Sequence, residues 1–469
     1  MTISTDGPSS GTSGAVLARR SVVAGAVGNF IEWYEFGVYA YFATTIAADF
    51  FTPQGGGAAE ALVRTYASFA LAFFFRPVGA LLLGRVGDRY GRRPALIAAV
   101  LTMTAATTAI GLLPTYATVG AVAPWLLTAL RIVQGLSAGG EFGGAVALMT
   151  ESAPPGKRGV YGAWQSLTVA FGLLGGAGAA TLVTSALTEG QVAVWGWRLP
   201  FLAALPMGLG ALWLRLRLAE SPAFVRAARA DRVRVRIAPG ASAKSTAGQA
   251  VSGPAAGQAV SGPAAAGESA SARTVFAVVV GCGRLMAWSA AGYTFLVVLP
   301  TYLQQTVGRS AQQALLATVV ANLGFAAAIV PAGALSDRLG RRPVMVTGAV
   351  LAALSALPLL HVVRAPGSPV WLTCGAVALA GALVGLLAGP GPAMLAEMFP
   401  TQARHTGLGV AYALANAVFS GCAGLLITEL VRRTGNPDVP AYYVVVTCAV
   451  GALALATSRD DGHRGALRD

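Results

Sequence analysis

The sequence has few charged residues for its length. Of its 469 residues, only 11% are Asp, Glu, Lys or Arg, whereas 55% are hydrophobic. Soluble domains carry roughly a quarter charged residues. This shortage excludes an ordinary water-soluble domain and indicates a protein that crosses the membrane several times.

Cysteine and histidine are also scarce. The four cysteines lie singly in apolar segments, without the spacing of a metal site, at Cys282, Cys374, Cys422 and Cys448. No nucleotide-binding or nucleophilic catalytic constellation is evident either. We therefore expect neither an enzyme nor a bound metal or cofactor.

Acidic residues are outnumbered by basic ones, 19 to 33, which gives a formal net charge of +14. A nucleic-acid-binding protein can show this balance, but here the basic residues cluster in short connections between apolar segments. That pattern is typical of the cytoplasmic loops of membrane proteins. The expected partners are the lipid bilayer and a small solute, with no nucleic acid.

The long apolar segments predict an all-α membrane protein. A transmembrane helix needs about 20 apolar residues, and about twelve segments meet this length: 22–48, 62–86, 94–113, 121–149, 159–184, 195–216, 275–303, 313–336, 343–363, 370–396, 405–431 and 441–457. An even number of spans places both termini on one side of the membrane. The basic loops lie on that side, so we expect cytoplasmic termini.

Composition also divides the chain into five parts. A Ser/Thr/Gly-rich tail (1–18) and a C-terminal tail (459–469) flank two six-helix bundles, at 19–216 and 274–458. Between the bundles, residues 217–273 begin with a basic stretch and contain an identical nine-residue Gly/Ala/Ser/Pro repeat. Such a repeat cannot bury enough surface to fold. We interpret this part as a cytoplasmic, partly disordered spacer; regulatory docking is the alternative.

One turn between spans occurs twice. The stretch from Gly84 to Pro94 returns almost unchanged from Gly333 to Pro343. So many charges cannot lie in lipid, so both turns must be in water on the same face, which indicates two homologous halves. The residues predicted to control opening in these turns are Gly84, Asp88, Arg89, Arg92, Arg93, Asp337, Arg338, Arg341 and Arg342.

A second feature also recurs in both halves. Glu151 is followed by Arg158, and Glu397 by Arg404, at the ends of the fourth and tenth spans. We interpret these residues as a latch that pairs with the turn arginines and closes the cytoplasmic side in one state. The alternative is ordinary helix-end charges among the lipid headgroups.

Several polar residues lie where lipid would surround an exposed side chain. A charge at that depth costs a few kcal/mol or more, so it normally faces a partner or a cavity. At roughly 100° per residue, four polar residues of the first span share about a third of its circumference: Asn29, Glu32, Glu35 and Tyr39. Other spans contribute Arg76, Arg131, Gln134, Glu141, Gln165, Arg284 and Trp288.

These residues suggest distinct roles. Two carboxylates one turn apart in a low dielectric repel, so we expect at least one of Glu32 and Glu35 to bind a proton reversibly. The planar fork of Arg131 matches a substrate carboxylate. For Arg76 and Glu141, a structural ion pair is an equal alternative. Gly135, Gly139 and Gly143 form a separate stripe that suits close helix packing.

The paired Gly-x-x-x-Asp-Arg-x-Gly-Arg-Arg-Pro turns resemble the loop signature of the major facilitator superfamily, and the resemblance covers nearly the whole chain. The stretch Gly28 to Phe36 resembles the first-helix signature of the metabolite:proton symporter branch. So do the stretches 75–79, 134–143, 195–201 and 300–303. The chain departs from the branch at Glu35, where aspartate is usual, and in the eleventh span, 412–425.

The resemblance implies proton-driven uptake of a carboxylate-bearing metabolite across a bacterial inner membrane. Candidate solutes are a dicarboxylate or α-keto acid, a shikimate-like acid, or proline and betaine. Energy would come from the proton-motive force, with no cofactor, and a monomer is expected. The residues expected to contact the solute are Asn29, Tyr39, Arg76, Arg131, Gln134, Gln165, Arg284 and Trp288. Efflux by proton antiport, or a non-transporting membrane sensor, are the alternatives.

Overall fold

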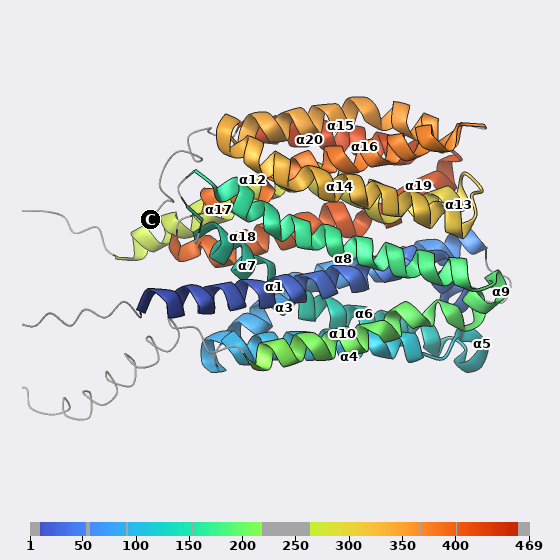
Figure 1. Cartoon of the computed structure of the whole chain (residues 1–469), viewed down its shortest axis with the longest axis horizontal. Coiled ribbons are helices and arrows are strands. Elements are labelled where there is room, and N and C mark those ends of the chain that lie inside the picture. The colour runs from blue at the N-terminus through green and yellow to red at the C-terminus, as the bar shows by residue number, and fades with distance from the viewer. Residues whose placement is uncertain are drawn as a thin grey trace, which may run out of the picture.

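The computed structural model describes residues 10–52, 57–90, 92–139, 141–151, 153–154, 156–217, 263–365, 367–399 and 401–457. All secondary structure in these residues is helical. The helices run side by side in a long bundle, with their axes along its length (Figure 1). Because lipid offers no hydrogen bonds, helices that satisfy their own backbone are the expected way to cross it.

The N-terminal half runs from α1 to α10. Its elements are α1 (Ser10–Tyr41), α2 (Ala43–Ile46), η1 (Ala47–Phe51), α3 (Ala58–Tyr90), α4 (Arg92–Leu112), α5 (Tyr116–Val119), α6 (Val122–Ala138), α7 (Glu141–Glu151), α8 (Arg158–Ala186), α9 (Glu189–Gln191), η2 (Val192–Gly196) and α10 (Arg198–Leu216).

The C-terminal half runs from α12 to α20. Its elements are α12 (Pro263–Tyr293), η4 (Thr294–Val298), α13 (Leu299–Gln305), α14 (Ala311–Leu339), α15 (Arg341–Arg364), α16 (Val370–Ala388), α17 (Gly391–Met398), α18 (Thr401–Ala415), η5 (Asn416–Gly421), α19 (Cys422–Thr434) and α20 (Val439–Ala456). The elements marked η are π-helical turns within or beside longer helices.

The twelve predicted spans are present. Within the described residues, ten helical segments are long and apolar enough to cross a membrane. The first span, in α1, and the fourth, in α6 and α7, complete the set. The protein therefore has the predicted fold class, an all-α membrane protein of two six-helix halves.

Two helices begin earlier than composition predicts. Helix α1 begins at Ser10, within the predicted disordered tail, and α12 begins at Pro263, within the predicted linker. Adding residues to an existing helix is far easier than nucleating one, so a stable span extends into neighbouring polar sequence. The rest of the linker (218–262) and the C-terminal tail from 458 lie outside the described residues.

The two halves meet along two lines of contact. Helix α8 lies between α1 of its own half and α14 of the other half (Figure 1). On the other side, α3 packs against α18, η5 and α19. Close approach requires glycine: a Cβ on Gly333 of α14 would lie 2.6 Å from the carbonyl oxygen of Gly159 in α8.

Two glycines of the predicted stripe, Gly135 and Gly139, pack closely as expected. A Cβ on Gly135 would lie 2.0 Å from the carbonyl oxygen of Ala72, and one on Gly139 equally close to that of Arg76. These contacts bring α6 against α3. The C-terminal half repeats the arrangement, with Gly381 of α16 against Ala321 of α14. Small residues at both crossings hold each half together tightly.

Two ends of the bundle are distinguished below. The basic face is the end where α1 and α12 begin and α10 and α20 end; it carries Arg158, Arg341 and Arg342. It lies at the left in Figure 1. The opposite face carries α5 and α9, at the right.

Candidate functional site

The two acids of α1 point into the protein. Glu32 is only 7% exposed, and Glu35 is 0% exposed. Oε1 of Glu32 lies 3.1 Å from an Nη atom of Arg76 in α3, which makes a buried ion pair. Neither acid faces the lipid.

Glu35 is connected to Arg131 by a chain of hydrogen bonds. Arg131 Nη1 donates to Gln134 Oε1 at 2.7 Å, and Gln134 Nε2 donates to Thr107 Oγ1 at 2.6 Å. The hydroxyl of Thr107 in turn donates to Glu35 Oε2 at 2.6 Å. All four residues are buried, so the chain links a cation and an acid without water. Hydrogen bonds in such a low-dielectric network reinforce one another.

Aromatic rings surround both buried arginines. The guanidinium carbon of Arg131 lies 4.1 Å from the ring centre of Tyr39 and 4.8 Å from that of Phe36. The guanidinium carbon of Arg76 lies 4.4 Å from the ring centre of Phe36 and 4.2 Å from that of Phe73. Rings stabilise a cation through their quadrupole, so these faces hold the two charges in place. Phe36 contacts both.

Arg131 has unused hydrogen-bonding capacity. Its Nε and Nη2 atoms are buried and have no hydrogen-bond partner among the described residues. Buried donors are normally paired, and an arginine fork matches a carboxylate with two parallel hydrogen bonds. These two atoms are therefore suited to bind an anionic group that enters the protein.

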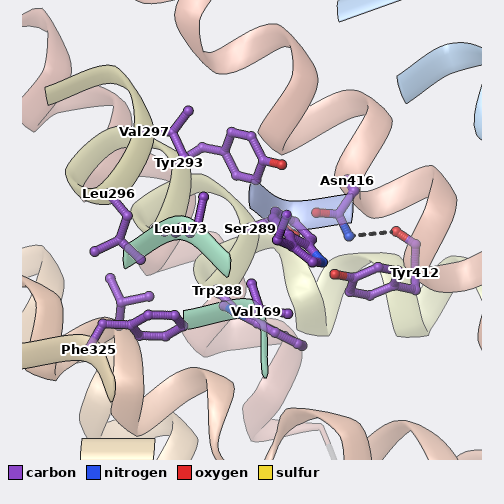
Figure 2. Close-up of a pocket in the computed structure, with 13 residues that line it drawn as sticks. Val169, Leu173, Trp288, Ser289, Tyr293, Leu296, Val297, Phe325, Tyr412 and Asn416 are labelled. Atoms are coloured by element: carbon purple, nitrogen blue, oxygen red, sulfur yellow. Dashed lines mark hydrogen bonds between the residues drawn. The ribbon is translucent and has the colours of Figure 1, made fainter. Parts of the chain in front are cut away.

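A central cavity of about 370 Å³ lies between the halves. Trp33, Val169 and Leu173 line it from the N-terminal half, and its other ten lining residues belong to the C-terminal half. Figure 2 shows the side chains of Trp288, Tyr293 and Tyr412 gathered around this space.

Aromatic and hydrogen-bonding contacts close the cavity at both ends. Towards the basic face, Phe142 of α7 stacks on Tyr412 of α18 with ring centres 3.4 Å apart. Towards the opposite face, Tyr66 of α3 donates to Thr301 Oγ1 at 2.8 Å. Each contact joins the two halves, so the structure is closed on both sides of the cavity.

A π-helical turn contributes to the closure at the opposite face. The hydroxyl of Tyr41 donates to the carbonyl oxygen of Leu296 at 3.1 Å. Leu296 lies in η4, and π-helical turns often occur at functional sites because they disturb the regular backbone ladder. Tyr293, which lines the cavity, is the residue just before this turn.

The basic face is closed by the second copy of the repeated turn. Asp337 accepts hydrogen bonds from the backbone N–H groups of Gly159 at 2.7 Å and Val160 at 3.0 Å. These donors belong to the first turn of α8, where backbone N–H groups have no partner within the helix and favour an anion. A turn of the C-terminal half thus holds a helix of the N-terminal half.

Charged side chains extend this contact. Arg341 bonds Asp337 Oδ1 at 2.7 Å and Glu397 Oε1 at 3.0 Å, while Arg158 lies 3.9 Å from the same Glu397 oxygen. The predicted pairing of a helix-end acid with a turn arginine is therefore present at Glu397 and Arg341. Because Arg158 belongs to the other half, this network crosses between the halves. Its role in gating stays a prediction.

Three other residues predicted to bind solute, Asn29, Tyr39 and Gln165, lie in the N-terminal half. Asn29 donates to Thr168, and the hydroxyls of Tyr39 and Ser68 are 2.6 Å apart. Gln165 is buried, with neither amide atom hydrogen-bonded within the described residues, and it lies one turn from Val169 on the same face of α8.

Arg284 does not join this group. It lies one turn nearer the basic face than Trp288, and its guanidinium bonds the last turn of α20, at Ala454 and Thr457. It does not line the cavity. Trp164, beside Gln165, is about half exposed on the outside of the bundle, because neighbouring helical residues point about 100° apart.

Several predicted gating residues, and also Glu141, which was predicted to form a structural ion pair, cannot be compared with the structure. The side chains of Asp88, Arg89, Arg92, Arg93, Glu141 and Arg404, and the surroundings of Gly84, lie outside the described residues. Glu151, Arg338 and Arg342 are exposed at the basic face. The contacts described above therefore concern one of the two repeated turns.

Sequence reasoning missed several residues of the site. Thr107, Tyr41 and Tyr66 were not singled out, nor was the stacking of Phe142 on Tyr412. Phe142 belongs to a quoted motif, which is the one signal that marks it in the sequence. The others are ordinary residues of apolar helices, and only their three-dimensional neighbours reveal them.

The chain is similar to known transporters along most of its length. The family model described as "Sugar (and other) transporter" matches residues 21–457. The chain is 30% identical over 450 residues to the "Proline/betaine transporter" of Escherichia coli K12, covering 95% of this chain and 84% of the relative. It is 32% identical over 466 residues to the "Ectoine/proline transporter ProP" of Corynebacterium glutamicum, covering 96% and 85% of the two chains.

A third relative and a solved structure extend the comparison. The "Inner membrane metabolite transport protein YhjE" of E. coli K12 is 33% identical over 450 residues, which cover 95% of both chains. The xylose transporter XylE of E. coli, in a partially occluded inward-open conformation, superimposes with a TM-score of 0.69 at 18% identity, covering 94% and 97% of the two chains. That likeness concerns the fold. The chain is thus a multi-pass membrane transporter for a small molecule, and it belongs to the sugar (and other) transporter family of the major facilitator superfamily.

Proposed function

We propose that this transporter imports a small zwitterion with one carboxylate, of the proline or betaine kind, together with protons. The observation that carries the proposal is the buried hydrogen-bonded chain from Arg131 through Gln134 and Thr107 to Glu35. It connects a group suited to a substrate carboxylate with a group suited to a proton. The names of two relatives, transporters of proline with betaine or ectoine, point to the same class of solute.

We infer that this hydrogen-bonded chain couples the binding of the proton to the binding of the solute. Ionised Glu35 partly compensates the buried charge of Arg131 through the hydrogen bonds that join them. When Glu35 takes up a proton, this compensation is lost, and an uncompensated buried charge is costly. A substrate carboxylate at Arg131 then restores it. Each ligand favours the other, which is the linkage that symport requires.

The ion pair of Arg76 with Glu32 favours a solute with one carboxylate over a dicarboxylate. An anion at Arg76 would compete with Glu32, which lies 3.1 Å away, whereas Arg131 bonds the amide of Gln134 and reaches an acid only through the hydrogen-bonded chain, so we assign the incoming anion to Arg131. A dicarboxylate would leave one of its charges without such a partner. A solute with one carboxylate fits better.

The cavity also suits a cationic group. None of the described residues that line it is acidic, whereas Trp33, Trp288, Tyr293 and Tyr412 present aromatic rings. Aromatic faces bind quaternary and other ammonium groups without a counter-charge. The rings of Tyr293 and Phe73, 5.5 Å apart, stand between the cavity and the arginines. We infer that Tyr293 moves aside, at the π-helical turn η4, when the carboxylate reaches Arg131.

The membrane orientation follows from charge. Basic loops remain on the cytoplasmic side, so the basic face and both termini are assigned to the cytoplasm of a bacterial inner membrane. The central site would be exposed alternately at each face as the halves rock. The energy source is the proton-motive force, without a cofactor, and the working unit is a monomer.

Uptake into proteoliposomes tests the proposal. With an inward proton gradient, we expect the wild type to accumulate labelled L-proline or glycine betaine, and an uncoupler to abolish accumulation. Glu35→Gln should lose accumulation but still exchange solute, whereas Arg131→Ala should lose both. Accumulation that resists the uncoupler, or full activity in both variants, would reject these roles. Outward pumping of the solute would favour efflux instead.

A further inference from the structure

We propose that a second cavity, inside the N-terminal half, binds water and carries the proton between Glu32 and the basic face. This inference rests on the proposed proton coupling. This small cavity, with room for about one water, is named here the proton chamber. Its walls come from α1, α4 and α6 and include Glu32, Ala99, Met103, Thr104, Ser137 and Ala138.

The proton chamber is separate from the central cavity. The two share no lining residue. Glu32 and Trp33 are neighbours in α1 and point about 100° apart: Trp33 lines the central cavity, and Glu32 lines the chamber. The wall of α1 therefore separates the space for the solute from the space beside the acid.

The chamber lies on the basic-face side of the coupling chain. Helix α4 begins at the basic face with Arg92, and its chamber residues precede Thr107, which bonds Glu35. Helix α6 runs the other way, and Ser137 and Ala138 form its end nearest the basic face. A proton that leaves the acids towards the cytoplasm thus meets this chamber first.

The chamber offers the polar partners that a buried water needs. Thr104 is buried, and its hydroxyl has no hydrogen-bond partner among the described residues. Ser137 donates to the carbonyl oxygen of Ala99 at 2.5 Å, which leaves the lone pairs of its hydroxyl to accept. With the carboxyl of Glu32, these groups supply the two to four partners that hold a buried water.

The proposed proton transfer needs only the carboxyl of Glu32 and water. When Glu32 is protonated during the cycle, its carboxyl gives the proton to a chamber water, which becomes hydronium and releases the proton to bulk water at the basic face. The carboxylate left behind is stabilised by Arg76 at 3.1 Å. Uptake from the other direction reverses the step. The solute meanwhile leaves through the central cavity, so it does not compete with water for the same path.

Silver ions test whether water reaches the chamber. In a variant whose four cysteines are replaced by serine, Ala138→Cys places a thiol in the chamber and Ser289→Cys places one in the central cavity. Ag⁺ is applied from the basic face with and without saturating L-proline or glycine betaine, and unreacted thiols are counted after denaturation. We expect both to react, with the solute slowing Ser289→Cys by about tenfold or more and Ala138→Cys by less than about twofold.

Two results would contradict the proposal that water reaches the chamber by a route separate from the solute. One is a cysteine at 138 that stays unreactive while the cysteine at 289 reacts; the other is equal protection of both by solute. The readout does not require transport. A wild type that accumulates neither solute would refute the proposed function, and the reactivity at position 138 without solute would still decide whether the chamber holds water.

Filling the chamber tests its role in proton movement. Ala99→Val adds methyl groups to a chamber wall, whereas Ala98→Val, on the same helix, does not line the chamber. For Ala99→Val we expect gradient-driven uptake to fall by about tenfold while solute exchange, which needs no net proton transfer and reports folding, stays within about twofold. Ala98→Val should leave both unchanged. An equal loss of uptake and exchange in Ala99→Val, or no loss, contradicts the proposal.

Discussion

The coupling chain makes a sharp prediction for Thr107. Its hydroxyl is the central link, since it accepts from Gln134 and donates to Glu35, each at 2.6 Å. Valine has nearly the same shape but no hydroxyl. Thr107→Val therefore removes both hydrogen bonds while leaving the packing of α4 almost unchanged.

The size of the effect follows from these two bonds. Leaving a buried donor or acceptor without its partner costs about 1–3 kcal/mol. A coupling free energy of this size corresponds to a factor of roughly 5–150 in affinity. In the wild type we expect solute affinity to be higher at acid than at alkaline pH. In Thr107→Val the ratio of these two affinities should be smaller than in the wild type by roughly this factor.

The measurement is solute affinity at acid and alkaline pH, from protection of Ser289→Cys or from exchange kinetics. The neighbour Thr108 supplies a matched control, since its buried hydroxyl has no hydrogen-bond partner among the described residues. Thr108→Val should keep the full pH dependence. If Thr107→Val keeps it as well, or if both variants lose it equally, the hydrogen-bonded chain does not couple proton to solute.

Three further predictions concern packing, recognition and the linker. Gly333→Ala places a methyl group 2.6 Å from Gly159 O, so the basic face should no longer close, and Ser289→Cys should react faster from that face. Trp288→Ala should weaken glycine betaine binding by about 1–2 kcal/mol, and Trp288→Phe by less, in protection assays. Deleting residues 240–262, which precede α12, should leave uptake within about twofold; loss of function would instead favour a sensor.

Much of the fold could be predicted from sequence because the lipid imposes it. Apolar length alone located the twelve spans, and the repeated turn at Gly84 and Gly333 revealed the two halves. The burial of Glu32 and Glu35 followed from the cost of placing charge in lipid. Helix starts were less accurate, since a stable span extends into polar sequence such as the residues after Ser10.

The details of the site needed the structure. Helix α4 carries several threonines, among them Thr104, Thr107 and Thr108, and nothing in the sequence distinguishes the one that meets Glu35. The contact between Phe142 and Tyr412 joins distant segments, so no local pattern reveals it. The sequence suggests that Glu32 and Glu35 act as one pair, yet in the structure each has a different partner.

Measuring proton and solute movement together in proteoliposomes tests the coupling most directly. With L-proline or glycine betaine added outside and no imposed gradient, we predict that the wild type takes up protons with the solute, so that the outside becomes alkaline. Glu35→Gln should exchange solute without this alkalinisation. Solute uptake by the wild type without accompanying protons would contradict the central claim.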